Sequence, residues 1–431
     1  MKEDDILQKT VIAKNINFAH LKAEHFKTNR ITVQFLMDLS PQNLSQSAII
    51  PFLLTRKCKK YPTFRELSKK LANLYDTSLY FDVEKYGDTL AIQISASSID
   101  KKFTFDGADT LAQAADLLCE AIFNPLVEDE KFDENLVENE KRLLIERIEN
   151  EINEKRSYAL NKAFEVMCGG EPFAAFKYGT IEQARAITPA SAYKAWKNML
   201  ENARVEIIVS SSGEVGEISE RFKTAFGKIN RTDCALTNPI IKPASAVKDE
   251  NETMDIAQAK LVLGLRSNID FKSDETVAAM LFTDIFGGGT YSKLFKNVRE
   301  KMSLCYYCAA RYIRFKGIVT VDCGVDVNNI ELAKEAIMKH LNEMKNGEIS
   351  NEEISAAKAS ATNRMAGLYD KQAVLESWHL GQSLDDKIYS PDEFITAVNA
   401  VTAAQIAAVA KKFDLDTIFT LLPKEGASDA N

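Results

Sequence analysis

The first hundred residues alternate between short strand-like runs and one amphipathic stretch. The runs ITVQFL (31–36), LYFDV (79–83) and LAIQISA (90–96) are rich in β-branched and aromatic residues, a composition typical of strands. Between the first two, TFRELSKKLANLY (63–75) repeats apolar residues at the spacing of one helical face. The pattern predicts three strands, with a helix between the first and the second.

Longer amphipathic stretches follow these strands. Segments 109–123 and 189–200 each predict one helix, and the second leads into the strand VEIIVSS (205–211). The densely charged segment 128–167 is predicted as a longer helical stretch whose charges form a solvated face. Helices therefore dominate this part of the chain.

The periodic pattern stops at residues 230–251 and then begins again. Segment 230–251 holds two prolines and many polar residues without a period, which is typical of a linker. Beyond it, 260–267 predicts a strand and 273–286 a helix, followed directly by Gly287, Gly288 and Gly289. The second part of the chain thus repeats the order of elements seen in the first.

Two pairs of segments share both character and spacing. Segment 186–214 parallels 400–426, each a Thr-capped helix that feeds a buried strand, and 127–141 parallels 349–363. The corresponding positions are 214 residues apart in the first pair and 222 in the second. The similar offsets indicate one α/β unit of about 210–220 residues used twice, with chance similarity of amphipathic helices as the alternative.

Neighbouring strand pairs predict the fold class. The pairs 79–85 with 89–97 and 306–314 with 317–325 read as antiparallel hairpins, whereas a doubly wound sheet needs strict strand–helix alternation. We therefore expect an α+β protein of two homologous halves, each a mainly antiparallel sheet with helices packed on one face. The expected divisions are an N-terminal half (1–229), a linker (230–251) and a C-terminal half (252–431).

Composition narrows the class of protein. Lys and Arg number 54 against 62 Asp and Glu, a formal charge of −8, so the chain lacks the positive charge of a nucleic-acid or anionic-membrane binder. No run approaches the roughly 18 apolar residues of a membrane helix, and MKEDDILQKT lacks the apolar stretch of a signal peptide. Seven scattered cysteines, an odd count, fit a reducing compartment. These features favour a cytoplasmic protein.

Histidine is too sparse and too scattered for a paired metal site. No two of the four histidines are spaced i,i+3 or i,i+4, so no helix face offers two imidazoles to zinc. In HLKAEH (20–25) the two histidines would point to opposite faces of an extended chain, so we expect surface histidines there. The four are His20, His25, His340 and His379.

Three further motifs are better explained by structure than by chemistry. In a strand, Cys305 and Cys308 would face opposite sides of the sheet, which predicts a structural role. The glycines 287–289 lack the ending of a phosphate-binding loop and favour a tight turn with close backbone approach. The basic run RKCKK (56–60) favours a solvated loop.

Arg299 and Tyr306 form the most specific candidate pair. Arg299 ends a helix that starts after the glycines, and Tyr306 enters a strand seven residues later. A guanidinium fork and a phenol at such a corner can hydrogen-bond a peptide carbonyl or its oxyanion.

The string around this pair resembles a known family. Residues 282–323 closely resemble the C-terminal half of pitrilysin/insulinase (inverzincin) metallopeptidases, where a small-residue turn, a Ser-x-Leu-Phe helix, Arg-Glu-Lys, Leu and Tyr follow in this order. Residues 59–74 look like the segment after that family's zinc helix, and residues 25–40 resemble its YmfF-type bacterial branch. The resemblance implies that the two halves form a clamshell.

The zinc motif of the family is missing. Counted back from Tyr-Pro-Thr, its H-x-x-E-H falls on residues 48–52, so Ala48 and Phe52 replace the zinc-binding histidines and Pro51 the general-base glutamate. The third ligand, a glutamate in the family, would fall at Glu146 or Arg147. A lone carboxylate cannot hold zinc. The resemblance therefore implies a chain without metal that is inactive as a peptidase alone.

The resemblance also implies a role for the intact pair. In two-subunit members of the family an inactive chain faces the zinc site of a partner, so Arg299 would grip the substrate backbone and Tyr306 the scissile carbonyl. The expected partner is an H-x-x-E-H subunit that carries the zinc, with a peptide as substrate. For the isolated chain a homodimer is left open as an alternative to the heterodimer. The alternatives are a peptide-binding accessory of protein assembly or modification without proteolysis, and an independent peptidase with an unrecognised site.

Overall fold

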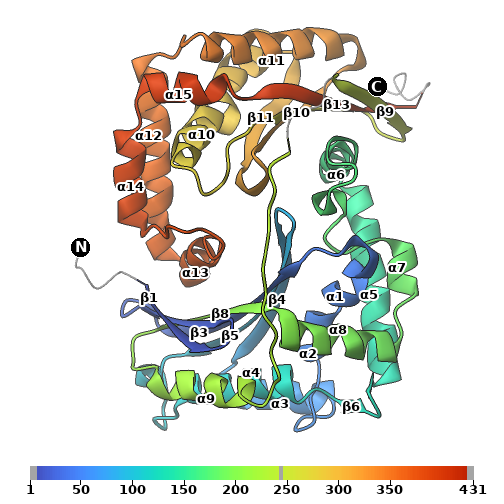
Figure 1. The fold of residues 1–431 in the computed structure, drawn as a ribbon, viewed down its shortest axis with the longest axis vertical. Coiled ribbons are helices and arrows are strands. Elements are labelled where there is room, and N and C mark those ends of the chain that lie inside the picture. Colours follow the sequence, from blue (N-terminus) through green and yellow to red (C-terminus); the bar gives the residue numbers. More distant parts are fainter. Residues whose placement is uncertain (1–6, 242–245, 425–431) are drawn as a thin grey trace. The chain divides into compact units, whose positions relative to one another are not determined.

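The computed structural model describes residues 7–241 and 246–424, and its contacts divide the chain into two compact units (Figure 1). Unit 1 takes the chain up to Glu149, Ala175–Thr237 and Leu368–Leu384. Unit 2 takes Asn150–Ala174, Asn238–Gly367 and the chain from Asp385 onward. Each unit therefore includes a segment from the opposite half of the sequence. The start of MKEDDILQKT and residues 242–245 of the expected linker lie outside the described residues.

Unit 1 is built on a six-stranded sheet with the order β1-β2-β8-β3-β5-β4. Neighbouring strands pair antiparallel except for β2 and β8, which run parallel. The strands, in sheet order, are β1 (Gln8–Ala13), β2 (Ile16–Lys22), β8 (Arg204–Ser211), β3 (Thr28–Asp38), β5 (Thr89–Ile99) and β4 (Ser78–Tyr86).

The two faces of this sheet differ in polarity because alternate side chains point to opposite sides. On β3 the odd-numbered Ile31, Val33 and Phe35 are fully buried in the apolar core with the helices. The even-numbered Thr32 and Gln34 hydrogen-bond residues of the segment 376–383 on the other face. The apolar face therefore holds the core, and the polar face receives a segment from the C-terminal half.

The helices of unit 1 follow that division. The core residues of α4, α5, α8 and α9 pack with the apolar residues of β3, β5 and β8. Helix α13 lies on β8 and β3 from the polar side. The helices are α1 (Leu44–Ala48), α2 (Ile50–Leu54), α3 (Phe64–Asn73), α4 (Thr110–Phe123), α5 (Glu134–Asn153), α7 (Ile181–Arg185), α8 (Pro189–Asn202), α9 (Gly216–Phe226) and α13 (Gln372–Leu380).

Unit 2 repeats this topology on a five-stranded sheet with the order β11-β12-β10-β13-β9. The last pair, β13 with β9, is parallel like β8 with β2, and the other pairs are antiparallel. The predicted repeat is therefore confirmed. The strands are β11 (Cys305–Ile313), β12 (Ile318–Val325), β10 (Ala259–Arg266), β13 (Asp414–Pro423) and β9 (Lys248–Met254).

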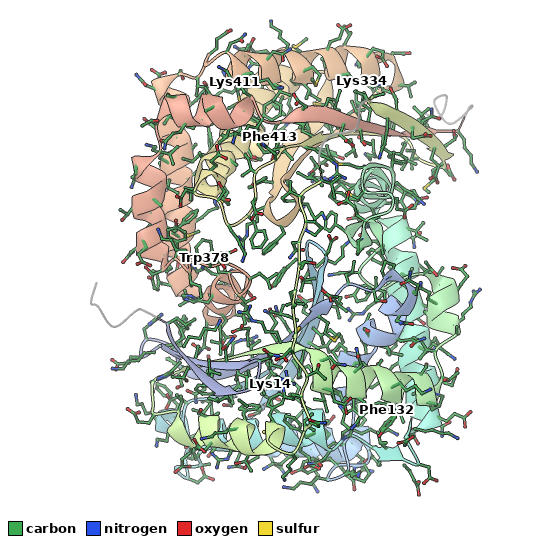
Figure 2. The ribbon with its side chains drawn as sticks, in the orientation of Figure 1. Lys14, Phe132, Lys334, Trp378, Lys411 and Phe413 are labelled. Carbon is green, nitrogen blue, oxygen red and sulfur yellow. The ribbon has the colours of Figure 1, made fainter. Side chains whose placement is uncertain are left out.

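Helix α6 covers one face of the sheet of unit 2. It contacts β13, β10 and β9, and it approaches β10 so closely that a Cβ on Gly264 would lie 2.7 Å from the Met167 sulfur. On the opposite face, Phe282 of α10 stacks on the fully buried Phe413, which Figure 2 labels. The helices are α6 (Lys155–Met167), α10 (Glu275–Thr283), α11 (Ile330–Lys345), α12 (Asn351–Ala366), α14 (Pro391–Ala400) and α15 (Ala403–Ala410).

Two sequence boundaries differ from the structure. The charged stretch 128–167 forms two helices, α5 and α6, after a short hairpin of β6 (Val127–Glu128) and β7 (Lys131–Phe132). The break between α5 and α6 lies at Glu154, where the apolar side chains pass from one hydrophobic core to another. Ile148 before the break packs in the core of unit 1, and Ala159 after it packs in the core of unit 2. Residues 248–251 of the expected linker belong to β9 (Lys248–Met254). This strand lies at a sheet edge, and its mostly polar, exposed residues carry no strand pattern.

No single described helix is long and apolar enough to cross a membrane. By length and composition alone, the consecutive helices α14 and α15 pass such a test together, although the chain bends by 89° between them.

Candidate functional site

The positions that the family resemblance assigns to the degenerate zinc motif lie at the junction of α1 and α2. Ala48 ends α1 and is fully buried, while Pro51 and Phe52 lie in the first turn of α2. A proline is tolerated there because the first N–H groups of a helix have no partner within the helix. Phe52 is 1% exposed and packs against Phe81 of β4, with ring centroids 4.5 Å apart. This junction is an apolar contact and offers no metal donor.

Arg147 faces this junction from α5. Its guanidinium carbon lies 4.8 Å from the centre of the Phe52 ring and 5.5 Å from that of Phe81. Its Nη1 donates to the Tyr178 hydroxyl at 3.4 Å. Glu146 instead pairs with Arg142 at 2.5 Å on the exposed side of the same helix. Of the two residues that the sequence left open as the third ligand position, Arg147 is the one that meets the motif.

These residues do not fit a zinc ion. Zinc takes thiolate, imidazole or carboxylate ligands, and the junction presents a methyl group, a proline, a phenyl ring and a guanidinium. The positive charge of Arg147 would also repel a cation. Across residues 7–241 and 246–424, no group of three His, Cys, Asp or Glu residues could hold a metal ion.

A buried carboxylate lies near this junction on the same helix. Glu140 is 4% exposed and pairs with Arg56 at 3.0 Å. Burial raises the pKa of Glu140, and the charges of Arg56, Arg147 and Arg142 oppose that rise. Since Arg56 already pairs with it, Glu140 is a structural anchor of α5.

The predicted pair Arg299 and Tyr306 lies in unit 2. Arg299 belongs to a wide π-helical segment, η6 (Leu294–Lys301), and its guanidinium stacks on Phe295 at 4.5 Å. Its side chain is 40% exposed and lies 3.7 Å from Glu300. Tyr306 occupies a bulge in β11 and is 71% exposed. In the described part of the chain neither side chain hydrogen-bonds the other, and both are open to a ligand.

The same bulge overturns the expectation for Cys305 and Cys308. The register shifts between Cys305 and Tyr307, so both cysteines are buried on one face and hydrogen-bond each other. This hydrogen bond lowers the pKa of the Cys305 thiol, with a smaller contribution from the charge of Arg299. Cys308 is also the cross-strand partner of Cys323, and all seven cysteines are free thiols within the described ranges. The prediction of opposite faces was wrong because it assumed regular alternation.

The glycine run shows the close approach that the sequence favoured. Gly287 lies in η5 (Asp284–Gly288), and a Cβ at this position would lie 2.6 Å from the backbone nitrogen of Ala310 on β11. No real Cβ fits in that space. The glycine therefore lets this segment rest directly on the sheet that carries Tyr306.

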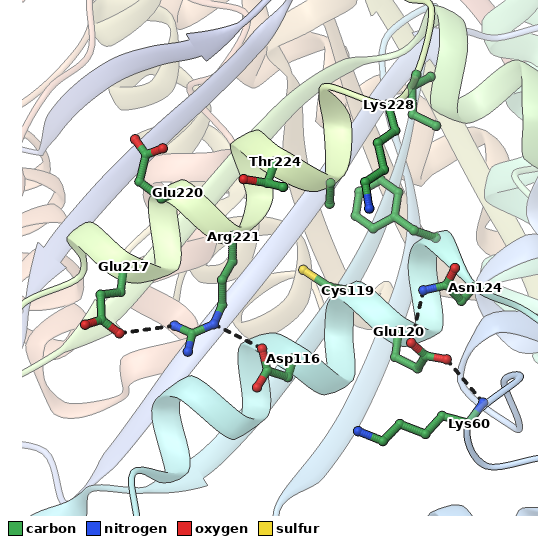
Figure 3. Close-up of a pocket in the computed structure, with 13 residues that line it drawn as sticks. Lys60, Asp116, Cys119, Glu120, Asn124, Glu217, Glu220, Arg221, Thr224 and Lys228 are labelled. Carbon is green, nitrogen blue, oxygen red and sulfur yellow. Dashed lines mark hydrogen bonds and ion pairs between the residues drawn. The ribbon is translucent and has the colours of Figure 1, made fainter.

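A surface pocket of about 740 Å³ lies between α4 and α9 in unit 1 (Figure 3). Arg221 reaches from α9 to Asp116 at 3.0 Å and to Glu217 at 3.7 Å. Cys119 lines the centre of the pocket, and burial raises the pKa of its thiol to about 12. Sequence reasoning missed this pocket, because it forms only when segments about a hundred residues apart pack together.

Comparisons with known proteins agree with these observations. Residues 186–361 match the family model described as "Peptidase M16 inactive domain". The chain is 29% identical over 411 residues to the Bacillus subtilis (strain 168) protein described as "Probable inactive metalloprotease YmfF", covering 95% of this chain and 96% of the relative.

Solved structures share the fold. A conserved protein from Enterococcus faecalis V583 has a TM-score of 0.90 at 27% identity and covers 99% of this chain and 100% of its own. A peptidase M16 inactive domain from Pseudomonas fluorescens, at 16% identity, has a TM-score of 0.79 with coverage of 97% and 98%. Over 95% of its length the chain is therefore similar to the zinc-less, YmfF-type branch of the pitrilysin/insulinase (M16) metallopeptidase family, and its residues 48–52 hold none of the zinc ligands of that family.

Proposed function

We propose that this chain is a non-catalytic, peptide-binding subunit of a heteromeric zinc peptidase and supplies Arg299 and Tyr306 to the active site of its partner. One observation carries the proposal. The positions of zinc ligands and general base are packed with apolar groups, while Tyr306 stands 71% exposed on a bulge. A phenol held out to solvent by a backbone irregularity has no packing role.

The two side chains suit a peptide bond under attack. The guanidinium of Arg299 donates several hydrogen bonds in a fixed plane and can hold a backbone carbonyl of the substrate. The hydroxyl of Tyr306 can donate to the scissile carbonyl oxygen as negative charge develops on it. A donor of that kind lowers the barrier by about 2.7–4 kcal/mol.

The sheet edge beside Tyr306 can hold an extended peptide. Among the described strands, β11 is the last of its sheet, so no strand pairs with its outer side. A peptide can add to such an edge through main-chain hydrogen bonds. This mode of binding places backbone carbonyls of the substrate along β11, where Tyr306 projects.

The partner must provide what this chain lacks. A subunit with an intact H-x-x-E-H motif would hold zinc, whose bound water becomes the nucleophile. In this proposal the present chain contributes substrate binding and orientation only. The subunits would therefore be inactive apart and active together.

The test begins with capture of the tagged chain from a native extract and identification by mass spectrometry of a stoichiometric partner that carries H-x-x-E-H. Peptide hydrolysis by the reconstituted pair is then measured with Arg299→Ala, Tyr306→Phe and the double variant. Arg185→Ala on α7 and Tyr80→Phe on β4, two exposed residues of unit 1, are matched controls. We expect a loss of about 100-fold or more in kcat for Tyr306→Phe and little change for the controls.

Full activity of the pair with both side chains removed would refute this role. It would favour the alternative, a peptide-binding accessory of protein assembly or modification without a part in proteolysis. The similarity over 95% of the chain to a relative described as probably inactive supports that alternative. Capture of a modifying enzyme or its target, without a zinc subunit, would directly support this accessory function.

A further inference from the structure

We propose that Arg147, backed by Phe52 and Phe81, binds a carboxylate group of the bound peptide. The inference rests on the proposed peptide-binding function and adds the chemical class of the group that is recognised. The position that faces the zinc motif would thus hold a fixed positive charge that recognises an anion.

The surroundings of Arg147 hold its guanidinium in place. The rings of Phe52 and Phe81 lie 4.8 and 5.5 Å from the guanidinium carbon, and the Tyr178 hydroxyl accepts from Nη1 at 3.4 Å. Phe52 and Tyr178 are buried, so these contacts restrict the movement of the arginine. A guanidinium that is already oriented loses less entropy when it forms hydrogen bonds to a ligand.

The charge of Arg147 is not neutralised by the protein. No carboxylate of the described residues lies within ion-pair distance of it, and its side chain is exposed. The neighbouring arginines are paired, Arg142 with Glu146 at 2.5 Å and Arg56 with Glu140 at 3.0 Å. Arg147 acts on Glu140 only through space, where its charge opposes the rise that burial causes in the pKa of that acid. Arg147 is therefore an oriented cation without a counter-ion.

A carboxylate fits this site better than other ligands do. The aromatic rings shield part of the guanidinium, which leaves its hydrogen-bonding edges for a planar acceptor, and a carboxylate can accept two parallel hydrogen bonds from one edge. The ring of Phe81 belongs to β4, the last strand of its sheet among the described strands. On this strand the N–H of Val83 donates to the Asp82 carboxylate at 2.8 Å.

The carboxylate can come from either of two parts of a peptide, its C-terminus or an acidic side chain. Binding is measured by calorimetry with three N-acetylated heptapeptides of alternating Thr and Val. The first is a free acid, the second its C-terminal amide, and the third an amide with one Glu in place of a Thr. The intact chain is used at one fixed ionic strength.

We expect the free acid, the Glu peptide or both to bind about tenfold or more tightly than the plain amide, as a hydrogen bond to a charged group predicts. The peptide that shows the gain identifies the source of the carboxylate. Arg147→Gln should abolish the gain and Arg147→Lys should restore only part of it. The matched control, Arg142→Gln five residues earlier on α5, should leave the gain unchanged.

Equal binding of all three peptides by the unmodified chain, or a gain that persists in Arg147→Gln, would overturn the inference. The first comparison needs no variant, so misfolding of a variant cannot obscure it. The proposed function fails in a different experiment, the hydrolysis assay with Arg299 and Tyr306, in which Arg147 plays no part as a donor to the oxyanion.

Discussion

Arg30 on β3 and Glu376 on α13 form a buried ion pair of 2.8 Å although 346 residues separate them in the chain. Glu376 also accepts a hydrogen bond of 2.8 Å from the hydroxyl of Thr32. A matching pair exists in unit 2, where Arg156 at the start of α6 binds Asp322 of β12 through two hydrogen bonds. In both units an ion pair fastens a helix from one half of the sequence to the sheet of the other half.

Removal of Arg30 should destabilise unit 1 strongly. Arg30→Met leaves Glu376 buried without its counter-ion, for which we expect a loss of about 3–5 kcal/mol in the free energy of unfolding, measured with urea. The double variant Arg30→Met/Glu376→Leu should lose less, because no unpaired charge then remains. A double variant that loses as much as the sum of the single variants would contradict this account.

His379, one helical turn after Glu376, should make stability depend on pH. Burial lowers its pKa to about 4 from an ordinary 6.5, so the folded chain keeps it neutral. Between about pH 4 and pH 6.5 the unfolded chain binds the proton and the folded chain does not. Stability should therefore fall as the pH drops through this window, by up to about 3 kcal/mol from this residue.

The measurement is urea unfolding at several pH values between 4 and 7.5, with His379→Gln beside the unmodified chain. The difference in unfolding free energy between the two should change along this range. Glu376 provides a contrast, because burial raises its pKa and its contribution falls as the pH rises. A pH profile that His379→Gln leaves unchanged would refute the assignment.

Gly287→Ala should destabilise unit 2 more than a comparable change at an open position. The new methyl group would meet the Ala310 backbone at 2.6 Å and its Cβ at 2.7 Å, and neither atom can rotate away. We expect a loss of about 1–3 kcal/mol, measured by thermal unfolding. Gly367→Ala, with no atom within 4 Å, is the control and should cost little. Equal effects would show that the close approach of η5 and β11 is dispensable.

Zinc should neither stabilise the chain nor remain bound to it. Since residues 48–52 and Arg147 supply no ligand, we expect the same melting temperature with added zinc and with a chelator. After equilibration with zinc and dialysis, elemental analysis should find no stoichiometric metal. A rise in melting temperature that saturates at one zinc per chain would disprove this conclusion.

The sequence predicted those elements whose pattern depends on local contacts. The β-branched and aromatic content of 31–36 and the helical spacing of 63–75 predicted β3 and α3, and the two similar offsets predicted the repeat. The strand β9 was missed because its residues KDENETM lie at a sheet edge and carry few apolar side chains. The break between α5 and α6 at Glu154 was missed because helical periodicity does not show which hydrophobic core the apolar face of a helix packs against.

The candidate site, too, could be predicted only in part from the sequence. The resemblance predicts the lost motif at Ala48, Pro51 and Phe52, but only the orientation of α5 shows that Arg147 faces these residues. The bulge at Tyr306 depends on the pairing of β11 with β12, so the sequence alone placed the two cysteines on opposite faces. Contacts between distant segments determine both the orientation of Arg147 and the bulge at Tyr306. The periodicity within one segment carries no information about such contacts.

Helix α6 comes from the first half of the sequence but packs in unit 2, and α13 comes from the second half but packs in unit 1. This arrangement affects how the chain folds during synthesis. When the ribosome has synthesised the strands of the first sheet, the hydrogen-bond partners of Thr32 and Gln34 in residues 376–383 are still missing. Only α14, α15 and β13 are synthesised after those partners. Conversely, β10 meets helix α6, which is synthesised about a hundred residues before it, and β13 meets the same helix about 250 residues after it was made. Neither half can finish folding as a separate product, so a gene split at residues 230–251 would yield two incomplete proteins that need each other.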